Sequence, residues 1–231
     1  MEIKLFLLLI IAHLLADFIF QPQRWSDKKE GRVFSKFHIY HVVIVGLLSY
    51  ILALDFGFWK AALLLTALHL STDVLKSWLI LKNSSRHYFF LDQFIHLISI
   101  TGIVIAYSHF SGINYIFDFE TKTIAIICGF IFCAKPANVF IKYLFKSFSI
   151  ETPHNQVESG LPNAGKLIGI VERFLALTLI ILGQYAAVGL IIAAKSILRF
   201  NDTQKSEYVL VGTLLSFGMA VFSGALIQLI K

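Results

Sequence analysis

The stretch FWKAALLLTALHLSTDVLKSWLIL, residues 58–81, decides the fold class, because it is mostly apolar over the length of a membrane span. A helix needs about 20 such residues to cross a hydrocarbon core about 30 Å thick. Further apolar runs of the same character cover 3–20, 37–55, 91–110, 122–146, 165–184, 186–200 and 208–230. Since 186–200 is short and Pro136 interrupts 122–146, the sequence predicts an all-α polytopic membrane protein with seven or eight transmembrane helices.

The composition places the chain in the same class. Of the 231 residues, 57% are hydrophobic and only 15% are charged, whereas a soluble domain carries about a quarter charged residues. Residues 1–20 lack a typical cleavage motif, and they hold His13 and Asp17 where a signal peptide would be purely apolar. We therefore expect this segment to be a span of the mature protein.

The basic residues predict which side of the membrane each loop faces. The net charge is +6, but Lys and Arg are spread over short connections, which argues against nucleic acid as a partner. The loops after the first, third, fifth and seventh spans hold most of the Lys and Arg near span ends, so the positive-inside rule places these loops in the cytoplasm. Lipid is the expected partner, with anionic lipid near the basic loop 24–36. The sequence does not indicate an oligomeric state.

Two similar polar patterns recur inside the apolar runs. HLLAD at 13–17 and HLSTD at 69–73 each place a His four residues before an Asp, at an offset of 56 residues, and His41 maps to His96 at an offset of 55. This recurrence predicts a duplicated helical hairpin, residues 1–55 and 56–110, whose four helices form a bundle. Residues 111–231 are expected to form a second helical half that carries basic residues within the same membrane domain.

Ionisable side chains at membrane depth usually face a bundle interior and serve a function. Residues i and i+4 share one helix face, and successive spans are antiparallel, so these polar residues fall at similar depth near the cytoplasmic leaflet. Imidazole and carboxylate ligands suit a divalent transition metal. We expect zinc, with manganese or iron as alternatives. The predicted ligands are His13, Asp17, His41, His69, Asp73, Asp92 and His96.

Other polar residues are expected to assist this site. Asp17, Asp73 or Asp92 would act as a general base wherever it is not a ligand, and Lys76 would neutralise an anion or a developing negative charge. The side chains expected to hold the ligands or their neighbours in place are Gln21, His38, Gln93 and Glu172.

The second half offers basic residues for an anion. The stretch GLPNAGKLIGIVERF, residues 160–174, contains G-x-x-x-x-G-K, but Leu167 stands where a phosphate loop needs Ser or Thr, so a nucleotide site is not expected. The candidates for binding an anionic substrate are Lys166, Arg173, Lys195 and Arg199. The alternative is an ion pair of Glu172 with Lys195 or Arg199 that only joins helices.

Several motifs resemble a known family. The segments HLLADFIFQ, HLSTDVLK, LDQFIH and GKLIGIVER, with GLIIAAKSILRF and EYVLVGTLLS further on, are similar to DUF3307, a family of bacterial integral membrane proteins. The similarity covers nearly the whole chain. It implies a multi-pass protein of the bacterial inner membrane and supplies no activity. The His/Asp helices also resemble, in general character and without an alignment of residues, those of membrane-bound metal-dependent hydrolases.

The sequence leaves three functions open. The first is a membrane-embedded metal-dependent hydrolase acting on an amphiphilic anionic substrate. The second is a metal- or proton-coupled transporter in which the same His/Asp set is an ion site or relay. The third is a non-enzymatic membrane partner or signalling protein whose polar residues are structural clamps.

Overall fold

The computed structural model describes residues 2–30, 32–83, 87–150, 164–199 and 206–230, and every regular element among them is helical. The elements are α1 (Glu2–Leu14), the π-helical turn η1 (Leu15–Ile19), α2 (Gln23–Glu30), α3 (Lys36–Ala53), the 3-10 turn η2 (Phe56–Phe58), α4 (Trp59–Lys82), α5 (Tyr88–Phe110), α6 (Thr121–Cys133), α7 (Lys135–Ser147), α8 (Ala164–Ile181), α9 (Tyr185–Arg199) and α10 (Ser206–Leu229).

The described helices provide fewer candidate spans than the seven or eight predicted. Four are long and apolar enough to cross a bilayer: 36–53, 56–82, 88–110 and 210–229. The count rises to six if two bent pairs each form one span, namely α1 and η1 with α2, bent by 87°, and α6 with α7, bent by 48°. The second bend coincides with Pro136, as expected for a residue that cannot continue the hydrogen-bond ladder. Helix α8 carries three charged residues and α9 has only 15 residues.

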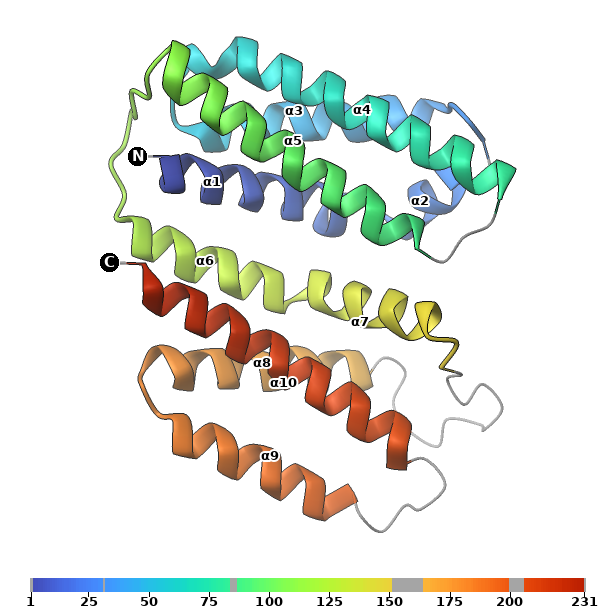
Figure 1. The fold of residues 1–231 in the computed structure, drawn as a ribbon, viewed down its shortest axis with the longest axis vertical. Coiled ribbons are helices and arrows are strands. Elements are labelled where there is room, and N and C mark those ends of the chain that lie inside the picture. Colours follow the sequence, from blue (N-terminus) through green and yellow to red (C-terminus); the bar gives the residue numbers. More distant parts are fainter. Residues whose placement is uncertain (1, 31, 84–86, 151–163, 200–205, 231) are drawn as a thin grey trace. The chain divides into compact units, whose positions relative to one another are not determined.

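The chain forms two compact units, 1–124 and 125–231. In the first unit, α1 packs against α3 and α5, and α4 packs against the same two helices, which gives a four-helix bundle with antiparallel neighbours (Figure 1). The short helix α2 packs against α3 and α4. In the second unit, α8 packs against α7, α9 and α10.

One half of the first bundle is an apolar core. It is built from the N-terminal part of α1, the α3–α4 connection and the C-terminal part of α5, with these buried members: Leu5, Leu9, Ala53, Phe58, Ala62, Leu65, Ile100, Ile103, Val104 and Tyr107. Helices in lipid associate mainly through close packing. In this core the rings of Phe58 and Tyr107 pack edge to face, with their centroids 4.9 Å apart. This half therefore closes the bundle at the end where α1 begins.

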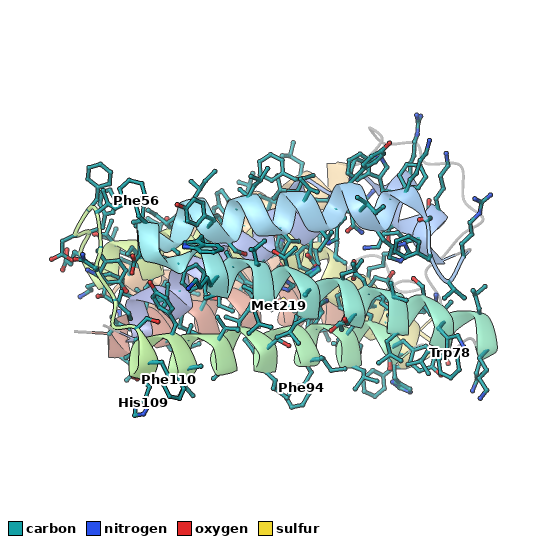
Figure 2. All side chains as sticks on the ribbon, turned by 90° about the horizontal axis from the view of Figure 1, so that it is seen from above. Phe56, Trp78, Phe94, His109, Phe110 and Met219 are labelled. Carbon is teal, nitrogen blue, oxygen red and sulfur yellow. The ribbon has the colours of Figure 1, made fainter. Side chains whose placement is uncertain are left out.

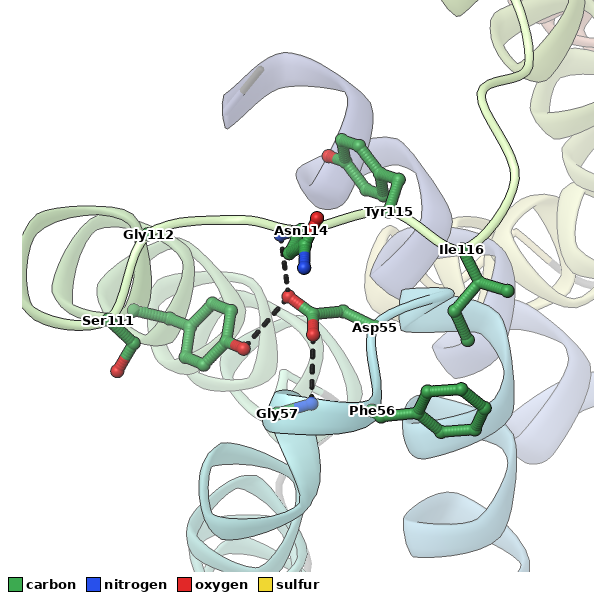
Figure 3. A pocket seen from close by; sticks show the side chains of 9 residues that line it. Asp55, Phe56, Gly57, Ser111, Gly112, Asn114, Tyr115 and Ile116 are labelled. Carbon is green, nitrogen blue, oxygen red and sulfur yellow. Dashed lines mark hydrogen bonds between the residues drawn. The ribbon is translucent and has the colours of Figure 1, made fainter.

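Asp55 ties the connections at this end together. Its carboxylate accepts hydrogen bonds from the backbone N–H of Gly57 at 2.8 Å, the hydroxyl of Tyr107 at 2.9 Å and the backbone N–H of Asn114 at 2.9 Å (Figure 3). The carboxylate lines a cavity of about 510 Å³. Because both carboxylate oxygens already have protein donors, Asp55 serves as a structural joint between the α3–α4 turn and the segment after α5.

The outer surface of the first unit is apolar, as a lipid-facing surface must be. Phe94 on α5 is 59% exposed and Phe110 at its end is 83% exposed. Figure 2 shows these side chains projecting away from the helices, with Trp78 toward one end of the bundle and Phe56 and Phe110 toward the other. Aromatic residues near both ends of spans are typical of membrane–water interfaces.

Candidate metal centre

The His and Asp residues predicted as ligands gather in the half of the first bundle opposite the apolar core. Helix α1 brings His13, and the π-helical turn η1 that continues it brings Asp17. The other three helices bring His41 (α3), His69 and Asp73 (α4), and Asp92 and His96 (α5). All seven predicted ligands therefore lie together, and each side chain is at most 11% exposed.

Four side-chain atoms form the first ligand group, which we call group A: Asp17 Oδ1, His41 Nε2, His69 Nε2 and Asp73 Oδ2. The two imidazole nitrogens are 3.0 Å apart. Asp17 Oδ1 lies 3.3 Å from His41 and 3.5 Å from His69, and Asp73 Oδ2 lies 3.7 and 4.0 Å from the same two nitrogens. Ligands about 2.05 Å from a tetrahedral ion are roughly 3.3 Å apart, so the His–His and His–Asp distances of group A are close to those of a coordination shell. Two sets here have ligand atoms that all lie within 4.8 Å of one another: His41, His69 and Asp73, and next to it His13, Asp17 and His69.

Three atoms form the second ligand group, group B: Asp73 Oδ1, Asp92 Oδ1 and His96 Nε2. His96 Nε2 is 3.3 Å from Asp92 Oδ1 and 3.8 Å from Asp73 Oδ1. The two groups are adjacent, since the rings of His69 and His96 stack with centroids 3.9 Å apart. Asp73 thus turns one oxygen toward each group.

Several of these buried atoms have no hydrogen-bond partner among the residues that the structure describes. They are His13 Nδ1, Asp17 Oδ1, His41 Nδ1, Asp92 Oδ1 and His96 Nε2. Buried polar atoms are nearly always paired, and leaving one unpaired costs about 1–3 kcal/mol. Three of the five, on Asp17, Asp92 and His96, belong to groups A and B. An ion with nitrogen and oxygen ligands would satisfy these three.

Gln93 orients two of the ligands. Its Oε1 lies 3.2 Å from His13 Nε2, and its Nε2 donates to Asp92 Oδ2 at 3.2 Å. If His13 Nε2 donates to the amide oxygen, the lone pair of Nδ1 is left facing Asp17 Oδ1, 3.6 Å away. His13 is accordingly a fifth candidate ligand beside group A, and Gln93 contacts two of the candidate ligands.

Two lysines on different helices, Lys76 on α4 and Lys29 on α2, pair with carboxylates of the ligand groups. Lys76 donates to Asp92 Oδ2 at 3.0 Å. Lys29, on α2, contacts Asp73 Oδ2, and Gln21 Oε1 lies 3.4 Å from the same ammonium. Lys29 was not predicted as a site residue. It lies in the basic segment 24–36, and the sequence pattern of that segment is equally well explained as a solvated loop. Its side chain is only 8% exposed.

His38 has a structural role in the described bundle. Its Nδ1 accepts from the backbone N–H of Ser35 at 3.1 Å, which closes the N-terminal capping box of α3. With Nδ1 as acceptor, Nε2 carries the proton and donates to Ser77 Oγ at 3.1 Å. Both ring nitrogens are therefore engaged away from the ligand groups.

The π-helical turn at 15–19 places Asp17. A π-turn inserts extra chain into a helix and is frequent at functional sites. Here it is followed by the 87° break before α2. The irregular backbone thus supplies both a ligand candidate, Asp17, and the change of direction that brings Lys29 back to the bundle.

The predicted anion-binding residues lie in the second unit. Arg173 is 1% exposed and donates to the carbonyls of Cys133 and Ala134, to Asn138 Oδ1 and to Ser216 Oγ, at 2.6 to 3.2 Å. Its guanidinium thereby caps the end of α6 at the break before α7.

The remaining basic candidates also belong to α8 and α9. Lys195 pairs with Glu172, which matches the alternative of an ion pair joining two helices. Lys166 is exposed near the start of α8. The side chain of Arg199 lies outside the described residues.

Comparison with known families adds one positive finding. The model of a family described as a protein of unknown function, DUF3307, matches residues 5–125, just over half of the chain. The chain belongs to the DUF3307 family. The matched region contains every member of ligand groups A and B, with Lys29, Lys76 and Gln93. No curated protein matches the chain. No solved structure matches it either.

Proposed function

We propose that this DUF3307 protein is a membrane-embedded metal-dependent enzyme, a hydrolase whose centre lies between α1, α3, α4 and α5. One observation carries the proposal: buried imidazole and carboxylate atoms from four helices face one another at ligand spacing, and three of them have no hydrogen-bond partner among the described residues. Nitrogen and oxygen donors of this kind suit zinc, our first choice, and also manganese or iron.

The chemistry follows from the donor set. A divalent ion held by His and Asp lowers the pKa of a bound water and so supplies a nucleophile at neutral pH. The protein's own share is to fix the ligands through Gln93 and Lys76 and to keep bulk water out by burial. A carboxylate oxygen not used as a ligand, such as the second oxygen of Asp17, would accept a proton from the water.

The charge of the site favours an anionic substrate. Asp17, Asp73 and Asp92 bring three negative charges, and Lys29 and Lys76 bring two positive ones. With neutral imidazoles the sum is −1, so one divalent ion raises it to +1. Since the site lies within an apolar bundle, we propose an amphiphilic anion that enters from the lipid.

The membrane arrangement supports the same proposal. We propose that the first bundle derives from a duplicated hairpin, because each pair of helices contributes one His/Asp pair and one later His. We also propose that α8 and α9 complete an eight-span protein of the bacterial inner membrane, with the lysine-rich α2 end in the cytoplasm.

The test combines metal analysis with turnover. The detergent-solubilised protein should carry stoichiometric transition metal and hydrolyse lipid-like phosphoesters, amides or esters, and both properties should be lost in His69→Ala and Asp73→Ala. His109→Ala removes a histidine from the exposed end of α5 and should change neither property. Absence of metal from the wild type, with unchanged thermal stability in His69→Ala and Asp73→Ala, would leave only a membrane scaffold.

A transporter is the second candidate, and one observation favours it. Transporter ion sites often lie at interrupted helices, and η1 and the 87° break lie beside Asp17. The apolar core around Leu9, Leu65 and Ile100 counts against a transporter, because these packed side chains close the path to the other end of the bundle. Metal uptake into proteoliposomes, absent for the enzyme and present for a transporter, separates the two.

A further inference from the structure

We infer that the centre is dinuclear, with Asp73 as the carboxylate shared by two cations. The inference rests on the proposed function, because it takes a metal centre as given. It assigns the number of ions and the side chains that hold each one.

The two oxygens of Asp73 point to different ligand groups. Oδ2 faces His41 and His69 at 3.7 and 4.0 Å, whereas Oδ1 faces His96 at 3.8 Å. A carboxylate oxygen has two lone pairs, so Oδ2 can accept from Lys29 and still bind a cation. Bridging carboxylates from facing helices are the way in which helical bundles build two-metal sites.

A single ion cannot serve both groups. An ion placed among the group A atoms satisfies Asp17 Oδ1 but leaves Asp92 Oδ1 and His96 Nε2, which pair with each other at 3.3 Å, without a hydrogen bond. The reverse placement leaves Asp17 Oδ1, 3.3 Å from His41 Nε2, without a hydrogen bond. Since each unpaired buried atom is costly, the geometry favours an ion in each group. The rings of His69 and His96 stack with their centroids 3.9 Å apart, so the two groups are adjacent.

The surroundings of Asp92 support the second ion. Lys76 and Gln93 both donate to its Oδ2, at 3.0 and 3.2 Å. These bonds leave Oδ1 directed at His96. Outer partners that hold a carboxylate in this way are characteristic of metal ligands. Group B therefore has an oriented carboxylate of its own and does not depend on group A.

The experiment uses the full chain in detergent, with Mn(II) as the probe. The wild type should bind two ions per chain by elemental analysis. Binding of the second ion should weaken the six-line electron paramagnetic resonance signal of the first, because the spins couple through the shared carboxylate. Asp92→Asn and His96→Gln should each retain one ion, held by group A. His41→Gln should retain one ion, held by group B. None of these one-ion variants should show coupling.

The controls separate folding from ligation. His109→Gln, on the same helix as His96, should still bind two coupled ions. Unchanged thermal unfolding of Asp92→Asn, which preserves side-chain size, shows that a lost ion reflects a lost ligand. One ion in the wild type overturns the dinuclear assignment and leaves the metal enzyme standing. Loss of all binding in a folded Asp92→Asn variant also overturns it. No metal in the wild type overturns the proposed function itself.

Discussion

Lys29 contacts Asp73 at the α2 end of the bundle, although the two residues lie 44 positions apart on different helices. The ammonium is held on the same carboxylate oxygen, Oδ2, that completes ligand group A. A carboxylate oxygen that already contacts a lysine is a poorer cation ligand than one that does not, because the nearby ammonium repels a metal ion.

Lys29→Gln should therefore strengthen metal binding, by about tenfold, or about 1.4 kcal/mol. Without added metal the variant should unfold more easily, because it leaves Asp73 with an uncompensated charge, at a cost of about 3–5 kcal/mol. Isothermal titration and thermal unfolding with and without Mn(II) measure both effects. Lys28→Gln, the exposed neighbour on α2, should behave as the wild type. Weaker metal binding in Lys29→Gln would instead make the lysine a supporting partner of the site.

Gln93→Leu should weaken metal binding by about 10–100-fold, because Gln93 holds both His13 and Asp92 in orientation without being a ligand candidate. Competition with a chelator gives the affinity. Gln23→Leu removes an exposed glutamine from α2 and is the matched control. An unchanged affinity in Gln93→Leu would show that packing alone orients the two ligands.

Asp55→Ala should lower the free energy of unfolding by about 2–3 kcal/mol, since it leaves Tyr107 and two backbone N–H groups without their acceptor. Tyr107→Phe removes one of these bonds and should cost about 1 kcal/mol. Denaturant titration in mixed micelles measures the loss. Metal affinity should stay at the wild-type value in both variants, because the joint lies at the opposite end of the bundle from the ligands.

Arg173→Ala should destabilise the second unit by about 2 kcal/mol or more, because the carbonyls of Cys133 and Ala134 lose their donor at the end of α6. Limited proteolysis and thermal unfolding report this change. Lys166→Ala, exposed on the same helix, should have no comparable effect. If Arg173→Ala instead leaves stability intact and raises KM for an anionic substrate, the predicted anion-binding role is the correct one.

Lys28→Cys and Phe119→Cys should react with a membrane-impermeant thiol reagent from opposite sides of the membrane. Both residues are exposed and belong to opposite ends of the first bundle. Substituting Ala for the two buried cysteines, Cys128 and Cys133, removes the background. The positive-inside rule expects Lys28→Cys to be labelled from the cytoplasm. Labelling of both variants from one side would contradict the span arrangement.

The convergence of the polar residues could be predicted because it depends on two regular periodicities. The spacing of four residues puts His69 and Asp73 on one face of α4, and the antiparallel order of spans puts them level with His96 and the end of α1. Neither step needs a tertiary contact. The same reasoning locates most helices from their apolar runs.

The features that were missed depend on irregular backbone. No residue pattern marks the π-turn that carries Asp17, and the 87° break after it decides that Lys29 returns to the bundle rather than extending into water. The sequence does not single out Asp55 either, because two of its three hydrogen-bond partners, Tyr107 and Asn114, lie more than 50 residues away. Two acceptors of Arg173 are the backbone carbonyls of Cys133 and Ala134, which lie where α6 ends. This is again a break in regular structure.

The apolar core between the ligand groups and the far end of the bundle has an electrical consequence. Around Leu5, Ala62 and Val104 it is packed with buried apolar side chains, which polarise weakly, so most of a membrane potential should drop across that half of the bundle. The ligand groups, at the lysine-rich end, would then sit close to the potential of the solution on that side. An ion arriving from that side would cross little of the voltage, and its affinity should stay nearly constant when vesicles are polarised.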